Sequence, residues 1–162
     1  MGREIERKFL VNGDHWRTLV DTGVVVRQGY LSLEPGRSVR VRLAADMGSL
    51  NIKGKISMLS RHEFEYAISA KDAHELLDKL CIQPQIVKTR YRLTHGGLVW
   101  EIDEFAGDND GLIIAEVELE SERQRFDAPA WLGKEVSHDP RYFNINLVKK
   151  PYSHWPDRPP MG

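Results

Sequence analysis

The stretch that decides the fold is Glu4-Ile5-Glu6-Arg7-Lys8-Phe9-Leu10-Val11. Successive side chains of a β-strand point to opposite faces of the sheet, so Glu4, Glu6 and Lys8 share one face of this segment. Three apolar residues of the stretch share the opposite face. This period of two predicts a strand with one charged face and one buried face.

The same alternation recurs between turn signals along most of the chain. It predicts eight strands, near residues 3–11, 25–34, 38–45, 49–56, 61–69, 86–95, 98–105 and 112–120. Tight-turn sequences such as Glu34-Pro35-Gly36 and His95-Gly96-Gly97 separate neighbouring strands, which should therefore pair antiparallel. The expected fold is mainly β (α+β), an antiparallel meander or barrel.

Two helices are expected beside these strands. Apolar residues recur at helical spacing behind Ser69 and Asp72, which predicts a capped helix that ends before Pro84. Asp139-Pro140 predicts the start of a second helix, with Asp as the cap and Pro in the first turn. Both helices are expected to cover the apolar outer face of a barrel.

The composition restricts the class of protein. The 162 residues suit one domain, expected at residues 1–150, and the proline-rich segment 151–162 is expected to be an irregular tail. The formal net charge is −1 and the four tryptophans are scattered, so nucleic-acid binding is not expected. No apolar stretch approaches the roughly 20 residues of a membrane helix, and the charged N-terminus does not resemble a signal peptide. We therefore expect a cytoplasmic protein without membrane contacts.

The charges on each predicted strand are nearly uniform in sign. The basic sets are Arg40/Arg42, Lys53/Lys55 and Lys88/Arg90/Arg92, and the acidic sets are Glu63/Glu65, Glu101/Asp103 and Glu116/Glu118/Glu120. One interpretation is a sheet with a solvated face, although such sheets usually mix signs across neighbouring strands. If the charged face instead turns inward, basic strands suit a polyanion and acidic strands suit hard divalent cations. Both together fit a metal-bound polyphosphate.

These residues also resemble a known family. The segment Glu4-Ile5-Glu6-Arg7-Lys8 resembles the E-x-E-x-K signature of the CYTH superfamily, the triphosphate tunnel metalloenzymes. Further matches follow in the family's order at Arg40-Val41-Arg42, Lys53, Glu63-Phe64-Glu65, Lys88-Thr89-Arg90-Tyr91, Glu101-Ile102-Asp103 and Glu116-Val117-Glu118. The resemblance implies an eight-stranded antiparallel tunnel, a closed β-barrel with a few covering helices, that holds a small-molecule triphosphate. It also implies one or two divalent metal ions, Mg²⁺ or Mn²⁺.

Within the family, the short chain looks most like the small bacterial inorganic triphosphatases. The resemblance thus implies hydrolysis of tripolyphosphate to pyrophosphate and phosphate by a metal-activated water. In class IV adenylate cyclases a His-Phe pair often precedes the signature, whereas only three residues precede Glu4 here. A cyclase, a thiamine or nucleoside triphosphatase, and a non-catalytic polyphosphate-binding module remain alternatives.

The binding residues of the expected site follow from the chemistry of its ligands. The expected phosphate contacts are Arg40, Arg42, Lys53, Lys88 and Arg90. The expected metal ligands are Glu4, Glu6, Asp103, Glu116 and Glu118. The first and last strands of a closed barrel become neighbours, which brings most of these carboxylates together. Glu63 and Glu65 are expected to orient the basic residues or to bind a second metal ion.

The proton transfer needs a further group near the attacking water. Lys8 lies among other charged residues, and we predict that neighbouring cations lower its pKa toward neutrality. Tyr30 falls on the same inward register of the second strand and is predicted to share the proton transfer. The sequence does not indicate an oligomeric state.

Overall fold

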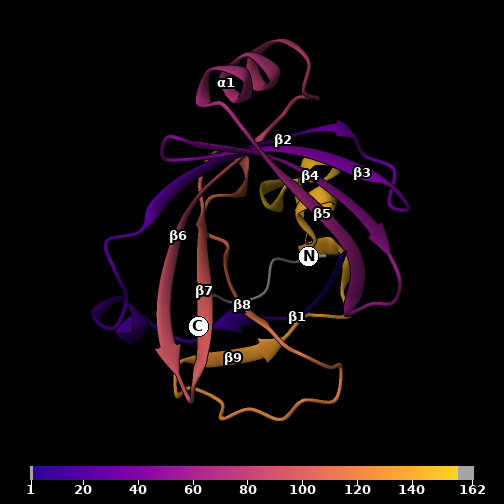
Figure 1. The fold of residues 1–162 in the computed structure, drawn as a ribbon. Helices are drawn as coiled ribbons and strands as arrows, with labels where there is room; N and C mark the ends of the chain where they lie inside the picture. Colours follow the sequence, from indigo (N-terminus) through magenta and orange to yellow (C-terminus); the bar gives the residue numbers. More distant parts are fainter. Residues whose placement is uncertain (1, 157–162) are drawn as a thin grey trace.

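The computed structural model describes residues 2–156 and contains a closed, eight-stranded antiparallel β-barrel (Figure 1). Its strands are β1 (Gly2–Val11), β2 (Val24–Ser32), β3 (Ser38–Ala44), β4 (Met47–Lys55), β5 (Ser60–Ile68), β6 (Ile86–His95), β7 (Leu98–Phe105) and β8 (Ile113–Glu118). Around the wall they follow the order β1-β5-β4-β3-β2-β6-β7-β8, and β8 returns to β1. The predicted barrel and its antiparallel pairing are confirmed.

The strand β1 closes the barrel because it pairs with three other strands. Its first residues, Gly2–Ile5, pair with β5, and residues 6–10 pair with β8. A short ninth strand, β9 (Leu132–Glu135), pairs with the last part of β1 outside the ring. The sequence analysis did not predict β9, since four residues are too few to show an alternating pattern.

The first predicted helix is confirmed, and the second is placed differently. The helix α1 (Ala70–Lys79) begins at Ser69, whose side chain accepts a hydrogen bond of 3.0 Å from the backbone N–H of Asp72. Asp139 caps only a 3-10 turn, η3 (Pro140–Tyr142), and α2 (Asn144–Lys149) starts after Phe143. Phe143 has an extended backbone, with φ −73° and ψ 134°, which separates the two segments.

Three further 3-10 turns lie in the loops, at η1 (His15–Thr18), η2 (Gly107–Asn109) and η4 (Tyr152–His154). None of the helices in residues 2–156 combines the length and the apolar character needed to cross a membrane.

The outer face of the barrel is apolar and is covered in two places. On β3 and its neighbours, Val41 and Leu43 pack beneath Ala73 and Leu77 of α1, which lies outside the wall (Figure 1). On β1, β7 and β8, a second apolar cluster includes the buried rings of Trp16, Trp100 and Trp131. Chain segments around η1 and β9 supply this second cover, so the expectation that both helices cover the outer face is only half right.

The inner faces change from charged to apolar toward one end of the barrel. On the inner face of β1, the charged Lys8 is followed by the apolar Leu10. On the inner face of β6, the charged Lys88 is preceded by the apolar Ile86. These apolar ends pack against Leu147 of α2 and against the rest of the C-terminal segment. The C-terminal segment therefore fills one end of the barrel rather than covering its side.

Residues 151–156 contribute to this packing. Tyr152 and Trp155 are buried in the same cluster, and their rings pack edge to face with centroids 5.1 Å apart. The part of the predicted irregular tail beyond Pro156 lies outside the described residues, and the domain boundary at residue 150 stays a prediction.

Replacement of Gly29 tests the packing of α1 on the barrel. A Cβ atom at Gly29 of β2 would lie 2.8 Å from Cys81 Cβ and 3.1 Å from Leu77 Cδ2. We expect Gly29→Ala to lower the free energy of unfolding by about 1–3 kcal/mol, because the overpacked helix must shift. Gly36→Ala is the control, since nothing lies within 4 Å of a Cβ there. Urea unfolding measures both, and equal stabilities would contradict the close packing of α1.

Candidate active site

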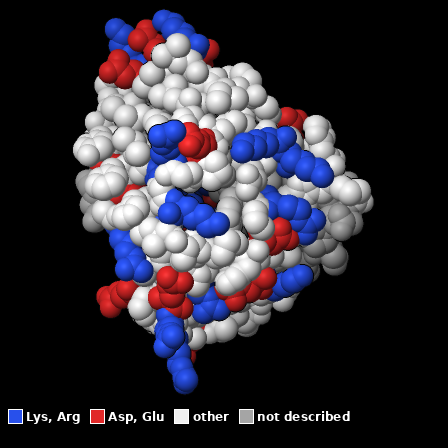
Figure 2. Space-filling model, turned by 90° about the vertical axis from the view of Figure 1, so that its right-hand side faces the viewer, with Lys and Arg blue, Asp and Glu red and all other residues white. Residues whose placement is uncertain are grey.

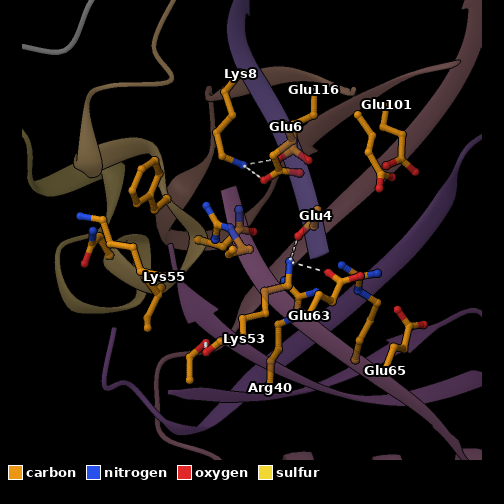
Figure 3. A pocket seen from close by; sticks show the side chains of 18 of the residues that line it. Glu4, Glu6, Lys8, Arg40, Lys53, Lys55, Glu63, Glu65, Glu101 and Glu116 are labelled. Atoms are coloured by element: carbon orange, nitrogen blue, oxygen red, sulfur yellow. Dashed lines mark hydrogen bonds and ion pairs between the residues drawn. The ribbon is translucent and has the colours of Figure 1, made fainter. Parts of the chain in front are cut away.

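The charged inner faces of the strands enclose a cavity of about 840 Å³ (Figure 3). Its basic lining residues are Lys8, Arg40, Arg42, Lys53, Lys55, Arg61, Lys88, Arg90 and Arg92. Its acidic lining residues are Glu4, Glu6, Glu63, Glu65, Glu101, Glu116 and Glu118. Basic side chains outnumber acidic ones, so the cavity is net positive in a chain whose formal net charge is −1. All predicted site residues except Asp103 line it.

The outer surface is charged in a different way. On the face shown in Figure 2, lysines and arginines are interleaved with aspartates and glutamates. A nucleic-acid interface usually has a continuous basic stripe, and this face does not show one.

Three arginines of the lining have buried donor atoms without acceptors. They are Arg40 and Arg42 of β3 and Arg61 of β5, and no described residue accepts a hydrogen bond from their Nε atoms. A buried donor that stays unpaired costs about 1–3 kcal/mol, and more when the group is charged. An anion in the cavity would supply the missing acceptors.

The neighbouring cations also lower the pKa of Arg42. The neighbouring Arg40 guanidinium, burial and Arg90 together lower the pKa of Arg42 to about 10, from an ordinary value of 12.5. Positive charge is therefore in excess on this side of the cavity, the basic wall, which is formed by Arg40, Arg42, Arg61, Lys88 and Arg90. The wall is therefore suited to a ligand with several negative charges.

The carboxylates of Glu4 and Glu6 on β1, Glu63 on β5, and Glu116 and Glu118 on β8 form the acidic wall of the cavity. Two lysines are held on it, each between two carboxylates (Figure 3). Lys8 Nζ lies 2.6 Å from Glu116 Oε1 and 3.1 Å from Glu6 Oε1. Lys53 Nζ lies 2.9 Å from Glu4 Oε2 and 3.1 Å from Glu63 Oε2. The strand register causes the first contact, because Lys8 of β1 lies opposite Glu116 of β8.

The carboxylates of this wall differ in how far nearby cations compensate their charge. Burial would raise the pKa of Glu116 and of Glu63, but Lys8 and Lys53 respectively lower it, whereas Glu118 has no such partner among the described residues. Burial raises the pKa of Glu118, and the charges of Glu4, Glu63, Glu6 and Glu101 raise it further. Carboxylate oxygens with excess negative charge are the donors that Mg²⁺ and Mn²⁺ prefer. Within residues 2–156, no three Asp, Glu, His or Cys side chains form a ready metal cluster. Lys8 and Lys53 hold some of the oxygens that a cation would take.

Asp103 lies behind the lining and holds two of the cations in place. Its side chain is fully buried and accepts two hydrogen bonds from Arg90, of 2.7 and 2.8 Å. Lys88 Nζ lies 2.8 Å from Oδ2 of the same carboxylate. Burial alone would raise the pKa of Asp103, but Arg90 and Lys88 lower it to about 2. Asp103 thus positions Arg90 and Lys88 in this structure and does not line the cavity, and its predicted metal contact stays a prediction.

The prediction that Lys8 has a lowered pKa is wrong. Burial disfavours the ammonium form of Lys8, but Glu116 and Glu6 outweigh burial and raise the pKa. The lysine with a lowered pKa is Lys88, at about 7, because burial and the nearby Arg90 and Arg42 outweigh its contact with Asp103. The sequence analysis assigned this property to the wrong lysine, since the alternating pattern does not show which cations meet which carboxylates.

The other predicted residues take positions that differ in exposure. Tyr30 is buried next to the apolar end of the barrel and also lines the cavity. Glu63 contacts Lys53, whereas Glu65 is exposed and accepts a hydrogen bond of 3.0 Å from Asn51.

Among the lining residues that the sequence analysis missed, three bear on the site. Arg61 lies two positions before Glu63 on β5, so the alternating pattern could have identified it. Phe143 and Asn144 come from the C-terminal segment and have no local signal. The Arg61 guanidinium lies 5.7 Å from the centre of the Phe143 ring, a cation–π contact that joins β5 to this segment.

A family model of the CYTH domain matches residues 2–152. The chain belongs to the CYTH family. This CYTH protein is 49% identical over 155 residues to the inorganic triphosphatase of Acetivibrio thermocellus, covering 96% of this chain and 99% of that protein. It is 39% identical over 154 residues to the inorganic triphosphatase of Nitrosomonas europaea, covering 90% of this chain and 96% of that protein. The family membership that the charged motifs predicted is confirmed.

Solved structures with the same fold include one of an inorganic triphosphatase. The crystal structure of the inorganic triphosphatase NE1496 aligns with a TM-score of 0.62 and 33% identity, covering 90% of this chain and 93% of that chain. The structure of a putative adenylate cyclase from Bacillus halodurans aligns with a TM-score of 0.59. Its identity is 16%, over 75% of this chain and 84% of that chain, so this similarity concerns the fold alone.

Removal of the Asp103 charge tests the ion pairs behind the basic wall. Asp103→Asn leaves Lys88 and Arg90 buried without their carboxylate, and we expect it to lower the free energy of unfolding by about 3 kcal/mol. Glu104→Gln is the matched control on the same strand, because Glu104 forms a partly exposed pair with Arg17. We expect that control to cost at most about 1 kcal/mol in urea unfolding. Similar losses in the two variants would contradict the positioning role.

Glu118→Gln tests the excess charge of the acidic wall. The pKa of Glu118 is raised in the folded protein, so its ionisation opposes folding above that pKa. In the presence of a chelator at pH 7, the variant should melt about 1–3 °C higher than the wild type. The gain should disappear as the pH falls below the ordinary value of 4.5, where Glu118 is protonated in both states. A lower melting temperature at pH 7 would refute the excess of negative charge.

Proposed function

We propose that this protein hydrolyses inorganic triphosphate to pyrophosphate and phosphate, with Mg²⁺ or Mn²⁺ as its metal ion. The observation that carries the proposal is the set of three cavity arginines, Arg40, Arg42 and Arg61, whose buried Nε atoms have no acceptor among the described residues. Two relatives that align over nearly their full length are named inorganic triphosphatases, which supports the same substrate.

The basic wall binds the substrate in this proposal. Phosphoryl transfer depends mainly on positioning and on compensation of negative charge. Arg40, Arg42 and Arg90 present planar guanidinium groups that suit two-point contacts with phosphate oxygens. Lys88, together with Lys53 from the acidic wall, acts as a point charge. Asp103 orients Arg90 and Lys88 before the substrate arrives, so little ordering of these side chains is needed on binding.

The acidic wall fits a divalent cation. Glu4, Glu6, Glu116 and Glu118 would hold it, because the raised pKa of Glu118 reflects negative charge that this wall does not compensate. When bound, a divalent cation offsets phosphate charge and lowers the pKa of a water that it binds. Lys8 is protonated and keeps Glu6 and Glu116 in place, and its third N–H remains for a phosphate oxygen. Tyr30 remains our proposal for a group that shares the proton transfer, and the cytoplasmic location also remains a proposal.

The test compares three substrates under three metal conditions. Phosphate and cyclic AMP release are measured from tripolyphosphate, ATP and thiamine triphosphate, with Mg²⁺, with Mn²⁺ and with a chelator. We expect metal-dependent phosphate release from tripolyphosphate, and a loss of about 100-fold in kcat/KM for Glu116→Ala, since Glu116 contributes to both walls. Glu120→Ala is the matched control, because Glu120 is exposed, follows β8 and does not line the cavity.

Each outcome assigns the site to one class. Cyclic AMP from ATP would place the protein among adenylate cyclases and would refute the proposed hydrolysis. Phosphate release only from an organic triphosphate would change the substrate. Binding of tripolyphosphate without release of phosphate under any metal condition would leave a non-catalytic polyphosphate-binding module.

A further inference from the structure

Asn144 is the first residue of α2 and lies where the C-terminal segment meets the charged cavity. It lines the cavity together with Lys88, which is buried and 5.4 Å from the ring of Phe105. Phe105 belongs to the apolar cluster that fills this end of the barrel. Asn144 therefore lies at the boundary between the charged part of the interior and its closed end.

The contacts of Asn144 determine which way its amide group points. Lys88 Nζ donates a hydrogen bond of 3.0 Å to Asn144 Oδ1, and Gln28 Nε2 donates one of 2.7 Å to the same oxygen. Nζ of Lys88 also lies 2.8 Å from Oδ2 of the Asp103 carboxylate, a contact in which the lysine donates, and in this ammonium form it can only donate to Asn144 as well. The atom that faces Lys88 is therefore the amide oxygen, which also accepts from Gln28. The amide nitrogen Nδ2 is consequently turned away from Lys88 and Gln28.

The nitrogen of this amide is available to a ligand. Among the described residues, no group accepts a hydrogen bond from Asn144 Nδ2, and this atom is not buried like the unpaired Nε atoms of the arginines. Lys88 uses two of its three N–H donors on Asp103 and Asn144, which leaves the third. A neutral donor and a cation thus stand side by side at the closed end.

We infer that Asn144 is a substrate-positioning residue that donates a hydrogen bond from Nδ2 to a terminal phosphate of the triphosphate, beside the contact from Lys88. The inference rests on the proposed function. It adds Asn144 to the residues that bind the substrate, and it assigns a terminal phosphate to the closed end of the cavity. The apolar cluster of Tyr30, Ile86 and Leu147 fills the space beyond. The group bound by Asn144 is therefore an unsubstituted phosphate, and any organic substituent must lie toward the open side of the cavity.

The variant Asn144→Asp separates this contact from a structural role. It keeps Oδ1 as an acceptor for Lys88 and Gln28, but it replaces the Nδ2 donor with an oxygen. Isothermal titration calorimetry with tripolyphosphate, without metal and therefore without turnover, measures the Kd. We expect the Kd to rise at least tenfold, with a melting temperature close to that of the wild type. The KM in the metal-dependent assay should rise by a similar factor.

The matched control is Asn146→Asp, which adds the same charge to the same lining. Asn146 Nδ2 already donates to the backbone oxygen of Pro140, at 2.8 Å, and has no role in the proposal. This control should weaken tripolyphosphate binding much less than Asn144→Asp. Asn144→Ala removes the donor without adding charge and should also raise the Kd, by about tenfold.

Three results would overturn the inference. They are an unchanged Kd in Asn144→Asp, equal losses in Asn144→Asp and Asn146→Asp, and an unchanged Kd in Asn144→Ala. The binding measurement needs no catalysis, so an absence of hydrolysis by the wild type would refute the proposed function while the role of Asn144 in binding is still tested.

Discussion

The cavity depends on the buried ion pairs that Asp103 forms with Arg90 and Lys88. A charge inside a protein must be paired, because the loss of its hydration is otherwise too costly. The carboxylate of Asp103 meets this requirement for two cations at once, through both of its oxygens. It holds them from behind, and both cations line the cavity. The basic wall can therefore be rigid and net positive before any ligand is present.

The charges of the two walls are compensated to different degrees by neighbouring side chains. The excess that remains on each wall suits a divalent cation on the acidic wall and a polyanion on the basic wall. Lysines held between carboxylates partly neutralise the acidic wall, yet the pKa of Glu118 shows that negative charge remains in excess. On the basic wall, Arg90 is paired with Asp103, whereas the buried Nε atoms of Arg40, Arg42 and Arg61 have no acceptor among the described residues. A ligand that combines a polyanion with a divalent cation would satisfy both walls, and it would stabilise the folded state through linkage.

A barrel with a charged interior must place its apolar core elsewhere. Here the core is divided among the outer face under α1, the outer face under the three buried tryptophans, and one end of the barrel. The third cluster has the greatest consequence for the site. It closes the interior with the C-terminal segment and brings Phe143 and Asn144, which are far from the other site residues in the sequence, into the lining.

The sequence by itself predicted the eight barrel strands, the antiparallel pairing of neighbours and the charges that share a face, while the inward direction of that face followed from the family resemblance. It could do so because a strand has a side-chain period of two, so the charges at Glu4, Arg40, Glu63 and Glu116 were assigned to one face without knowledge of the fold. The tertiary structure decided which charges meet, since contacts across a barrel depend on register and closure rather than on local pattern. For this reason Asp103 proved to be a support for Arg90, Lys8 proved to have a raised pKa, and Asn144 was found only in the folded chain.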